Sequence, residues 1–175
     1  MEMVFNPLYS PAAQFGDSCV NELEPEIAES WSFVDPTTLQ FKLRQGIKWH
    51  NKPPLNGREL KADDVVYTFN ERYAKGPAAG AYVGKVFFDK AEKVDDYTVN
   101  VLLKKPFDFI QGWPSGNRQG HIVAPEADTG KDAEGKPGAW RKDPTKSWVG
   151  TGPFMFDSFE NGVKVSFSRN PDYFK

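Results

Sequence analysis

Apolar and polar residues alternate with a period of two in three stretches of the chain. A period of two sends successive side chains to opposite faces of a strand, and a turn signal in the middle of each stretch lets the chain fold back. The stretches and their turns are 31–43 around Asp35-Pro36, 91–103 around Asp95-Asp96, and 154–167 around Asn161-Gly162. Each stretch therefore predicts a β-hairpin with one buried face.

A different period runs through residues 62–73. The apolar residues there recur at spacings of three and four, which places them on one stripe of a helix. They are Ala62, Val65, Val66, Phe69 and Tyr73. Asp63 and Asp64 stand in the first turn, where the helix dipole favours negative charge. This segment is the clearest helix that the sequence predicts.

Shorter apolar runs predict minor elements. We expect short strands at 47–49 and 122–123, and short helices at 82–88 and 107–113. Because hairpins outnumber helices and no strand–helix–strand rhythm is present, the sequence predicts an α+β fold with mostly antiparallel strands and few helices.

The aromatic residues of the periodic stretches predict the core. They are Trp31, Phe41, Trp49, Phe69, Phe154 and Phe156. The composition agrees, because 39% hydrophobic and 14% aromatic residues exclude a disordered chain. A chain of 175 residues buries about two thirds of its unfolded surface, so a substantial core is available.

The net charge of the chain bears on which classes of partner it can attract. The net charge of −2 gives no bulk attraction to nucleic acid or to anionic lipid, so we expect no nucleic-acid partner. No apolar run approaches the ~20 residues of a membrane span, and the first residues do not read as a secretory signal. The single cysteine, Cys19, has no internal disulfide partner.

The sequence contains few residue patterns that suggest a catalytic or metal-binding site. His50 and His121 do not have a metal-binding spacing, so we interpret both as structural histidines. The adjacent carboxylates Asp63-Asp64 and Asp95-Asp96 point apart, which suits a helix start and a turn rather than acid–base catalysis. Gly150-x-Gly152 lacks a phosphate-loop lysine. We therefore expect no enzymatic activity, no metal site and no cofactor.

A loop over residues 113–120 is the most suggestive ligand feature. Trp113 offers an apolar wall, and Arg118 offers a guanidinium that binds a carboxylate through two hydrogen bonds. The alternative interpretation is an exposed arginine beside a packed tryptophan. Spacing alone leaves both interpretations open.

Six blocks of sequence occur in the order shown by one known family. They are LEPEIAESW at 23–31, LQFKLRQGIKW at 39–49, KADDVVY at 61–67, DDYTVNVLLKKP at 95–106, GTGPF at 150–154 and RNPDYF at 169–174. In these blocks the chain resembles the bacterial extracellular solute-binding proteins of family 5, the peptide- and nickel-binding receptors of ABC importers. It departs from the family at Lys61, where a threonine often caps the helix.

The resemblance implies part of the first lobe of a two-lobed, periplasmic-binding-protein-like (class II) fold. Residues 1–10 and 115–175 would belong to the ligand-binding first lobe, and 11–114 would form a smaller inserted subdomain. Family members are some three times longer, so the second lobe and the export signal would be absent from this chain. The expected location is extracytoplasmic, in the periplasm or at the cell surface.

The resemblance also implies a function. The chain would be a fragment of the substrate-binding component of an ABC importer. It would bind a peptide or another small polar solute, metal chelates included, without transforming it, and its partner would be a membrane permease. The ligand-binding residues would be Met3, Phe5, Tyr82, Trp113, Asn117 and Arg118.

Two further expectations follow from a partial lobe. The alternative function is a scaffold or interaction subdomain that contacts a permease or sensor partner and does not itself bind ligand. Strands without their partners would leave apolar edges exposed, so we also expect self-association of the fragment through those edges.

Overall fold

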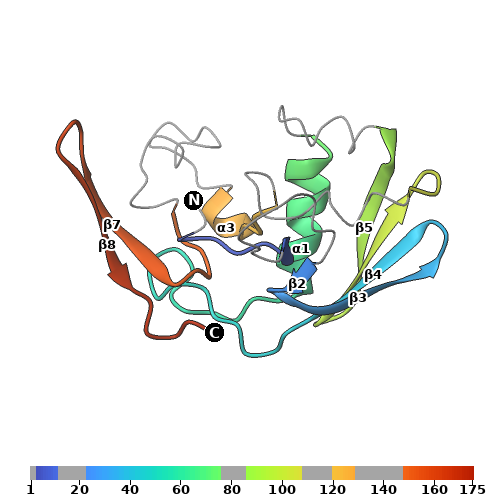
Figure 1. Cartoon of the computed structure of the whole chain (residues 1–175), viewed down its shortest axis with the longest axis horizontal. Coiled ribbons are helices and arrows are strands. Elements are labelled where there is room, and N and C mark those ends of the chain that lie inside the picture. The colour runs from blue at the N-terminus through green and yellow to red at the C-terminus, as the bar shows by residue number, and fades with distance from the viewer. Residues whose placement is uncertain (1–2, 12–22, 76–85, 108–119, 129–147) are drawn as a thin grey trace, which may run out of the picture. The chain divides into compact units, whose positions relative to one another are not determined.

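A computed structural model describes residues 3–11, 23–75, 86–107, 120–128 and 148–175 (Figure 1). The short helices predicted at 82–88 and 107–113 fall mostly outside these residues. Within them, strands are mostly antiparallel and helices are few, as predicted.

The largest sheet has four antiparallel strands in the order β3-β4-β6-β5. It is built from two hairpins, β3 (Ala28–Asp35) with β4 (Thr38–Leu43), and β5 (Phe88–Asp95) with β6 (Thr98–Leu103). A second pair joins β1 (Tyr9–Pro11) to β2 (Leu23–Pro25), and a third joins β7 (Phe154–Glu160) to β8 (Lys164–Arg169). All three predicted hairpins are confirmed.

The two hairpins of the large sheet have matching turns. The Asp35 carboxylate accepts the Thr37 backbone N–H at 2.7 Å, and the Asp95 carboxylate accepts the Tyr97 backbone N–H at 2.7 Å. Each aspartate thus fixes its own turn, and these bonds lower the pKa of both carboxyl groups. The hairpins meet along β4 and β6.

The predicted helix is present, but its geometry changes partway. Residues Ala62–Tyr67 form α1, and Thr68–Tyr73 continue as the π-helical segment η1. The Thr68 hydroxyl donates to the Asp64 carbonyl at 2.8 Å, and the Ala74 N–H bonds to Phe69 O, five residues back. A side chain that occupies a helix carbonyl in this way favours a local departure from α geometry.

The helix begins without a capping oxygen on its first flanking residue. Lys61 is that residue, and its backbone N–H donates instead to the Asp64 carboxylate at 3.1 Å. The Lys61 ammonium pairs with Asp96 at 2.7 Å. Asp64 therefore satisfies the Lys61 backbone N–H at a helix start that has no capping side-chain oxygen.

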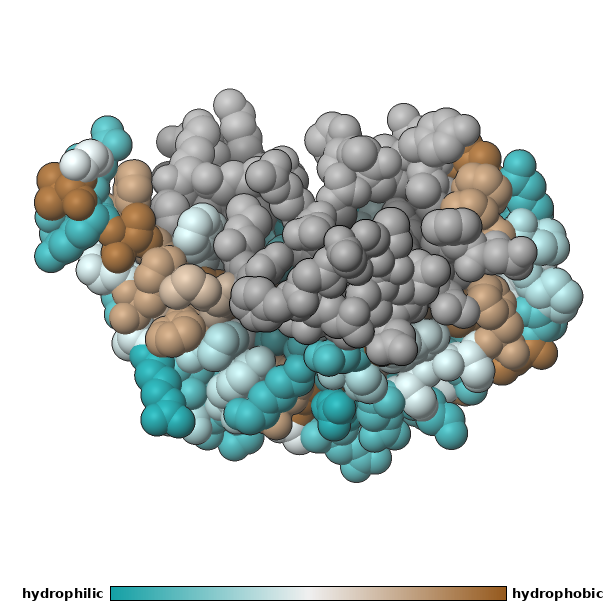
Figure 2. Space-filling model, in the orientation of Figure 1, coloured by the Kyte–Doolittle hydropathy of each residue, from teal (hydrophilic) through white to brown (hydrophobic). Residues whose placement is uncertain are grey.

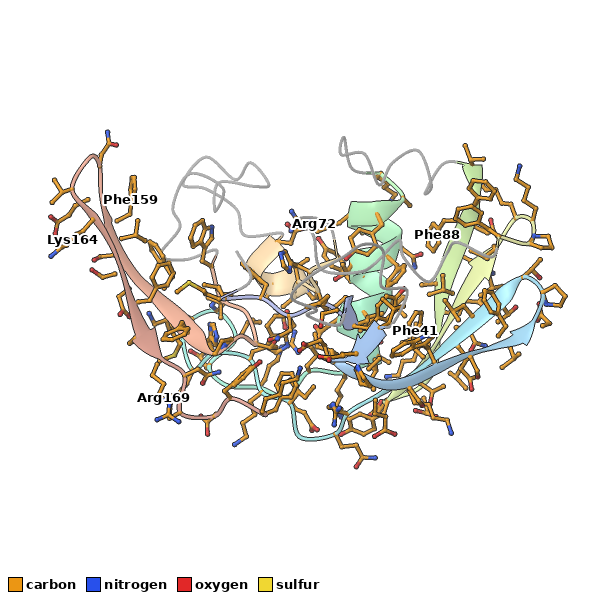
Figure 3. The ribbon with its side chains drawn as sticks, in the orientation of Figure 1. Phe41, Arg72, Phe88, Phe159, Lys164 and Arg169 are labelled. Atoms are coloured by element: carbon orange, nitrogen blue, oxygen red, sulfur yellow. The ribbon has the colours of Figure 1, made fainter. Side chains whose placement is uncertain are left out.

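An aromatic cluster forms the core beside the large sheet. Phe41 on β4 lies 5.9 Å from the ring of Tyr9 and 6.4 Å from that of Phe69, which in turn lies 6.0 Å from Phe88. All four side chains are buried. Figure 3 labels Phe41 and Phe88 within this cluster. Burying each phenylalanine contributes about 1.5–3 kcal/mol, so this cluster adds several kcal/mol to the stability of the sheet.

The chain divides into two compact units. Unit 1 comprises Met1–Phe5, Gly46–Leu60 and Val123–Lys175, and unit 2 comprises Asn6–Gln45 and Lys61–Ile122. Unit 1 holds the β7–β8 hairpin and the short helix α3 (Pro125–Asp128), and unit 2 holds the large sheet with its helix. The predicted division into a ligand-binding lobe (1–10 and 115–175) and an inserted subdomain (11–114) is defined by a ligand cleft, and it stays a prediction.

Two predicted short strands are wrong. Residues 47–49 contribute only an isolated bridge between Lys48 and Glu59, although Ile47 and Trp49 are buried as the alternation requires. Residues 122–123 are buried but not in a strand. The bridge beside them joins His121 to Pro7, which has no N–H to extend a ladder.

The β7–β8 hairpin is less buried than predicted. Phe156 is buried against Trp148 at 5.0 Å, but Phe154 is 39% exposed, so its assignment to the core is wrong. Toward the tip, Phe159, Val163 and Val165 are also exposed. Figure 2 shows hydrophobic residues among hydrophilic ones over this hairpin, at the left of the view. Trp31 is likewise only half-buried, although its ring lies 4.7 Å from Tyr9.

Candidate functional site

Two of the six predicted ligand-binding residues lie in the described part of the chain. Met3 is exposed, at 45%, whereas Phe5 is buried. The other four, which are Tyr82, Trp113, Asn117 and Arg118, lie outside the described residues. The site is therefore built here from the segment Met3–Phe5 and from the residues of unit 1 that hold it.

A loop at the start of β7 fixes this segment through backbone hydrogen bonds. The N–H of Gly152 donates to the carbonyl of Val4 at 2.9 Å, and the N–H of Phe154 donates to the carbonyl of Met3 at 2.9 Å. The segment thus runs alongside residues 150–154. These bonds set the position of the exposed Met3 side chain without involving it.

The two glycines of the loop allow this close approach. A Cβ placed on Gly150 would lie 1.9 Å from the Val4 carbonyl oxygen, and one on Gly152 would lie 2.6 Å from that of Met3. Real Cβ atoms do not come so near a backbone oxygen. The GTGPF block therefore has a packing role, in which glycine lets two backbones touch.

His50 holds the other side of the same loop. Its side chain is fully buried, its Nδ1 accepts the Gly150 N–H at 3.2 Å, and its Nε2 lies 2.9 Å from the Gly152 carbonyl. A carbonyl can only accept, so Nε2 carries the proton and the imidazole is neutral. Its backbone N–H also donates to Gly150 O at 2.8 Å. The prediction of a structural histidine is thus confirmed at His50.

The surroundings of His50 favour its neutral form. Burial lowers the pKa of His50, the bond to Gly152 opposes that effect, and the positive charge of Lys52 lowers the pKa further. The imidazole therefore acts as a fixed donor–acceptor pair at neutral pH.

The loop has a third support at the end of β8. The Asn170 side-chain amide donates to Gly152 O at 2.9 Å, and the Asn170 backbone N–H donates to Pro153 O at 2.8 Å. Asn170 is itself buried. The GTGPF and RNPDYF blocks of the sequence are therefore in direct contact through this residue.

Lys52 ties the same region to a bulge in β7. Its ammonium donates to the Phe156 carbonyl and to the Asp157 carboxylate, the latter at 3.0 Å. The β7–β8 register shifts at this point, between Phe156 and Ser158. The bond from Lys52 lowers the pKa of Asp157. The bulge keeps Phe159 on the same face as Phe156, because it adds one residue to the alternation.

The described residues of unit 1 hold the segment Met3–Phe5 by backbone hydrogen bonds. Among them, no three His, Cys, Asp or Glu side chains lie together in a way that could hold a metal ion. The helices described here are all too short or too polar to cross a membrane. What the site provides is a braced backbone segment and one exposed side chain, Met3. Sequence reasoning missed the bracing role of His50, because nothing local connects it to residues 150–152.

Comparisons with known proteins give a consistent assignment. The family model described as "Bacterial extracellular solute-binding proteins, family 5 Middle" matches residues 22–175. The chain is 31% identical to Di/tripeptide-binding protein 2 of Pseudomonas aeruginosa over 97% of its own length and 33% of that protein. It is also 31% identical to heme-binding protein A of Haemophilus influenzae, over 88% of the chain and 30% of the relative.

A solved structure shows the same fold. The solute-binding protein MoaA of Agrobacterium tumefaciens R10, solved in complex with mannopinic acid, superposes with a TM-score of 0.77 at 27% identity. That match covers 99% of this chain and 32% of the other. The described part of the fold is thus part of a class II solute-binding structure, as predicted. The chain spans about a third of the length of the relatives that it matches.

Proposed function

Because the chain belongs to the bacterial extracellular solute-binding proteins of family 5, we propose that it is the part of an importer receptor that presents one wall of the ligand site. Proteins of this family bind solutes rather than transform them, in agreement with the expectation of no enzymatic activity. The observation that carries the proposal is the family match over residues 22–175 together with the shared fold.

The solute is a short peptide or another small polar molecule. Similar relatives are named for di- and tripeptides and for heme, and one solved relative holds mannopinic acid. Relatives of equal identity thus take different solutes, so we assign the class of solute and not a single compound. A peptide carries a carboxylate, as does mannopinic acid, and the guanidinium of Arg118 is the partner that this chain offers it.

The site combines the opening segment with the residues predicted from the resemblance. Met3 contributes its exposed side chain, and Phe5, which is buried against Gly150, contributes backbone and shape. The other proposed ligand-binding residues, taken from the family resemblance, are Tyr82, Trp113, Asn117 and Arg118. A second lobe, lying in the part of the relatives that this chain does not cover, closes over the solute by hinge motion.

The proposed partner is the permease of an ABC importer, and the proposed location is the periplasm or the cell surface. The family description places its members outside the cytoplasm, and one relative is named as a probable ABC transporter periplasmic-binding protein. The same context makes self-association of the isolated chain through the exposed β7–β8 tip a prediction that gel filtration can test.

Isothermal titration on the full-length protein tests the site. The solutes are a set of di- and tripeptides, hemin, mannopinic acid and a metal chelate. We expect one class to bind, and Trp113→Ala and Arg118→Ala each to weaken that binding about tenfold or more. Arg169→Ala is the matched control, because Arg169 lies exposed on β8 (Figure 3). Unchanged affinity in both site variants would favour the scaffold alternative.

The 175-residue chain alone provides a second test. A tight site usually buries 70–90% of its ligand, and one wall cannot do so. We expect the chain to bind the solute much more weakly than the full-length protein does. Micromolar or tighter binding by the chain alone would contradict this.

A further inference from the structure

We propose that His50 is a positioning residue for the ligand site, which holds the segment Met3–Phe5 in place through the Gly150–Gly152 loop and does so only while its imidazole is neutral. The inference rests on the proposed function, because it gives that segment a role in binding. It assigns a role to a buried histidine that makes no contact with solvent.

The first step is the continuity of the contacts. His50 bonds to the loop at Gly150 and Gly152 through both ring nitrogens, at 3.2 and 2.9 Å. On its other side the loop bonds to Val4, through the Gly152 N–H at 2.9 Å. Gly152 therefore uses its carbonyl toward His50 and its N–H toward Val4, so the imidazole and the opening segment share one peptide residue.

The second step is that the loop is tightly packed against the opening segment. The Gly150 backbone lies so close to Val4 that a methyl group would not fit between them. Well-packed interiors transmit small displacements because their atoms have no free space to absorb them. A shift of the loop on the His50 side is therefore passed on to Val4, and with it to Met3.

The third step is the effect of a proton on Nδ1. In the neutral ring, Nδ1 accepts the Gly150 N–H. In the protonated ring, both nitrogens are donors, so two N–H groups would face each other across the same 3.2 Å gap. The bond to Gly150 is then lost, and the loop must move or the ring must turn.

Among the described residues, those that bond to the His50 ring or to the Gly150–Gly152 loop carry no negative charge that would compensate the protonated ring. The segments 3–5 and 150–153 contain no ionisable side chain, and Asn170, which shares the Gly152 carbonyl, does not titrate. The charge that acts on His50 is that of Lys52, which is a cation itself. Protonation of His50 thus adds a second positive charge in a buried place.

The affinity test compares the wild-type full-length protein with two variants between pH 7.5 and 4.5, with the solute identified by the titrations above. Because burial lowers the pKa of His50, we expect the wild-type affinity to fall about fivefold or more only below the ordinary titration range of a histidine, where His50 takes up its proton. His50→Leu, which removes both ring bonds, should bind weakly at every pH. His50→Gln keeps a donor for Gly152 and cannot titrate, so it should bind more tightly than His50→Leu, with a flatter pH profile than the wild type.

His121→Gln is the matched control for these variants, because His121 is the chain's other histidine and belongs to unit 2. We expect it to keep the wild-type pH profile. If His50→Leu bound the solute like the wild type at all pH values, the positioning role would be wrong while the proposed function stood.

A structural readout separates the two proposals. In ¹⁵N NMR spectra of the same protein, we expect His50 to carry its proton on Nε2, and the amide signals of Gly150, Gly152 and Val4 to shift with the His50 titration and in His50→Leu. Amide signals of Val4 that ignore both changes would overturn the positioning role. Failure of every solute to bind would overturn the proposed function alone, and the NMR result would still decide the role of His50.

Discussion

The side-chain amide of Asn70 forms two backbone hydrogen bonds with Ala91. Its Oδ1 accepts the Ala91 N–H at 2.8 Å, and its Nδ2 donates to the Ala91 carbonyl at 3.0 Å. Ala91 lies on β5, the last strand in the order of the large sheet. A helix side chain thus takes the place of a further strand at this edge, which satisfies backbone groups that would otherwise invite pairing with another chain.

Removing this amide should destabilise unit 2. Asn70→Ala leaves a backbone donor and an acceptor without their partner, at a cost of about 2 kcal/mol in the free energy of unfolding. Asn70→Asp should cost more, because a carboxylate oxygen would face the Ala91 carbonyl. Urea denaturation measures both, and the exposed Asn51→Ala serves as the control with a change within about 0.5 kcal/mol. Equal midpoints for Asn70→Ala and Asn51→Ala would contradict the role of the amide.

Gly150→Ala should be among the most destabilising single substitutions in unit 1. The added methyl group would overlap the Val4 carbonyl, and relieving the overlap requires two backbones to separate, at about 3 kcal/mol or more. Gly46→Ala is the matched control, because Gly46 has open space around it and only a φ of +78° to strain. That strain costs about 1 kcal/mol. Thermal unfolding followed by circular dichroism compares the two variants. A lower melting temperature for Gly46→Ala than for Gly150→Ala would refute the steric argument.

Two phenylalanines, Phe41 in the buried ring cluster and Phe159 at the exposed hairpin tip, should respond differently to truncation to alanine. Phe41→Ala opens a cavity within the ring cluster and should lower the free energy of unfolding by about 3–5 kcal/mol. Phe159→Ala, at the tip of β7–β8, should cost about 1 kcal/mol or less, because Phe159 is 56% exposed (Figure 3). Chemical denaturation of both variants checks the contrast. A large loss in Phe159→Ala would mean that the hairpin tip is covered in solution.

The Asp157 carboxyl group should titrate below its ordinary range. The Lys52 ammonium lowers the pKa of Asp157, so the ionised carboxylate stabilises the fold at neutral pH. That contribution is fully present above the ordinary pKa of an aspartate, about 3.9, and is lost as the pH falls through the lowered value. Carbon-detected NMR follows this titration.

Substitution of the ammonium provides the control for that titration. In Lys52→Met the pKa of Asp157 should rise toward its ordinary value. Lys164→Met, which removes an exposed lysine paired with Glu160, should leave the pKa of Asp157 as it is in the wild type. The attribution to Lys52 fails if both variants titrate alike.

The hairpins could be predicted because their signals are local. In each hairpin the alternation and the turn signal lie within about a dozen residues of sequence. In the two hairpins of the large sheet, Asp35 and Asp95 each bond to the residue two positions later. The helix was equally visible in its stripe of apolar residues. Its change to π geometry was not, because the π segment begins at Thr68, whose side chain bonds to a helix carbonyl, and the apolar period does not mark such a bond.

The errors and omissions have a different origin. Phe154 has the alternation of a core residue, yet burial depends on what covers a face, and the described residues cover only the Phe156 part of it. The support of the opening segment by His50 links residues that lie far apart in the chain through backbone groups, which all residues share. No side-chain pattern marks such a contact in advance.

The main chain crosses between the two units at four places, after Phe5, Gln45, Leu60 and Ile122. Neither unit is therefore a continuous length of polypeptide that a protease could release with one cut or a gene fragment could encode alone. Excising 61–122, for example, would separate β5 and β6 from the β3–β4 hairpin on which they complete their sheet. Limited proteolysis should accordingly leave each unit built from more than one fragment rather than release either unit as a single piece.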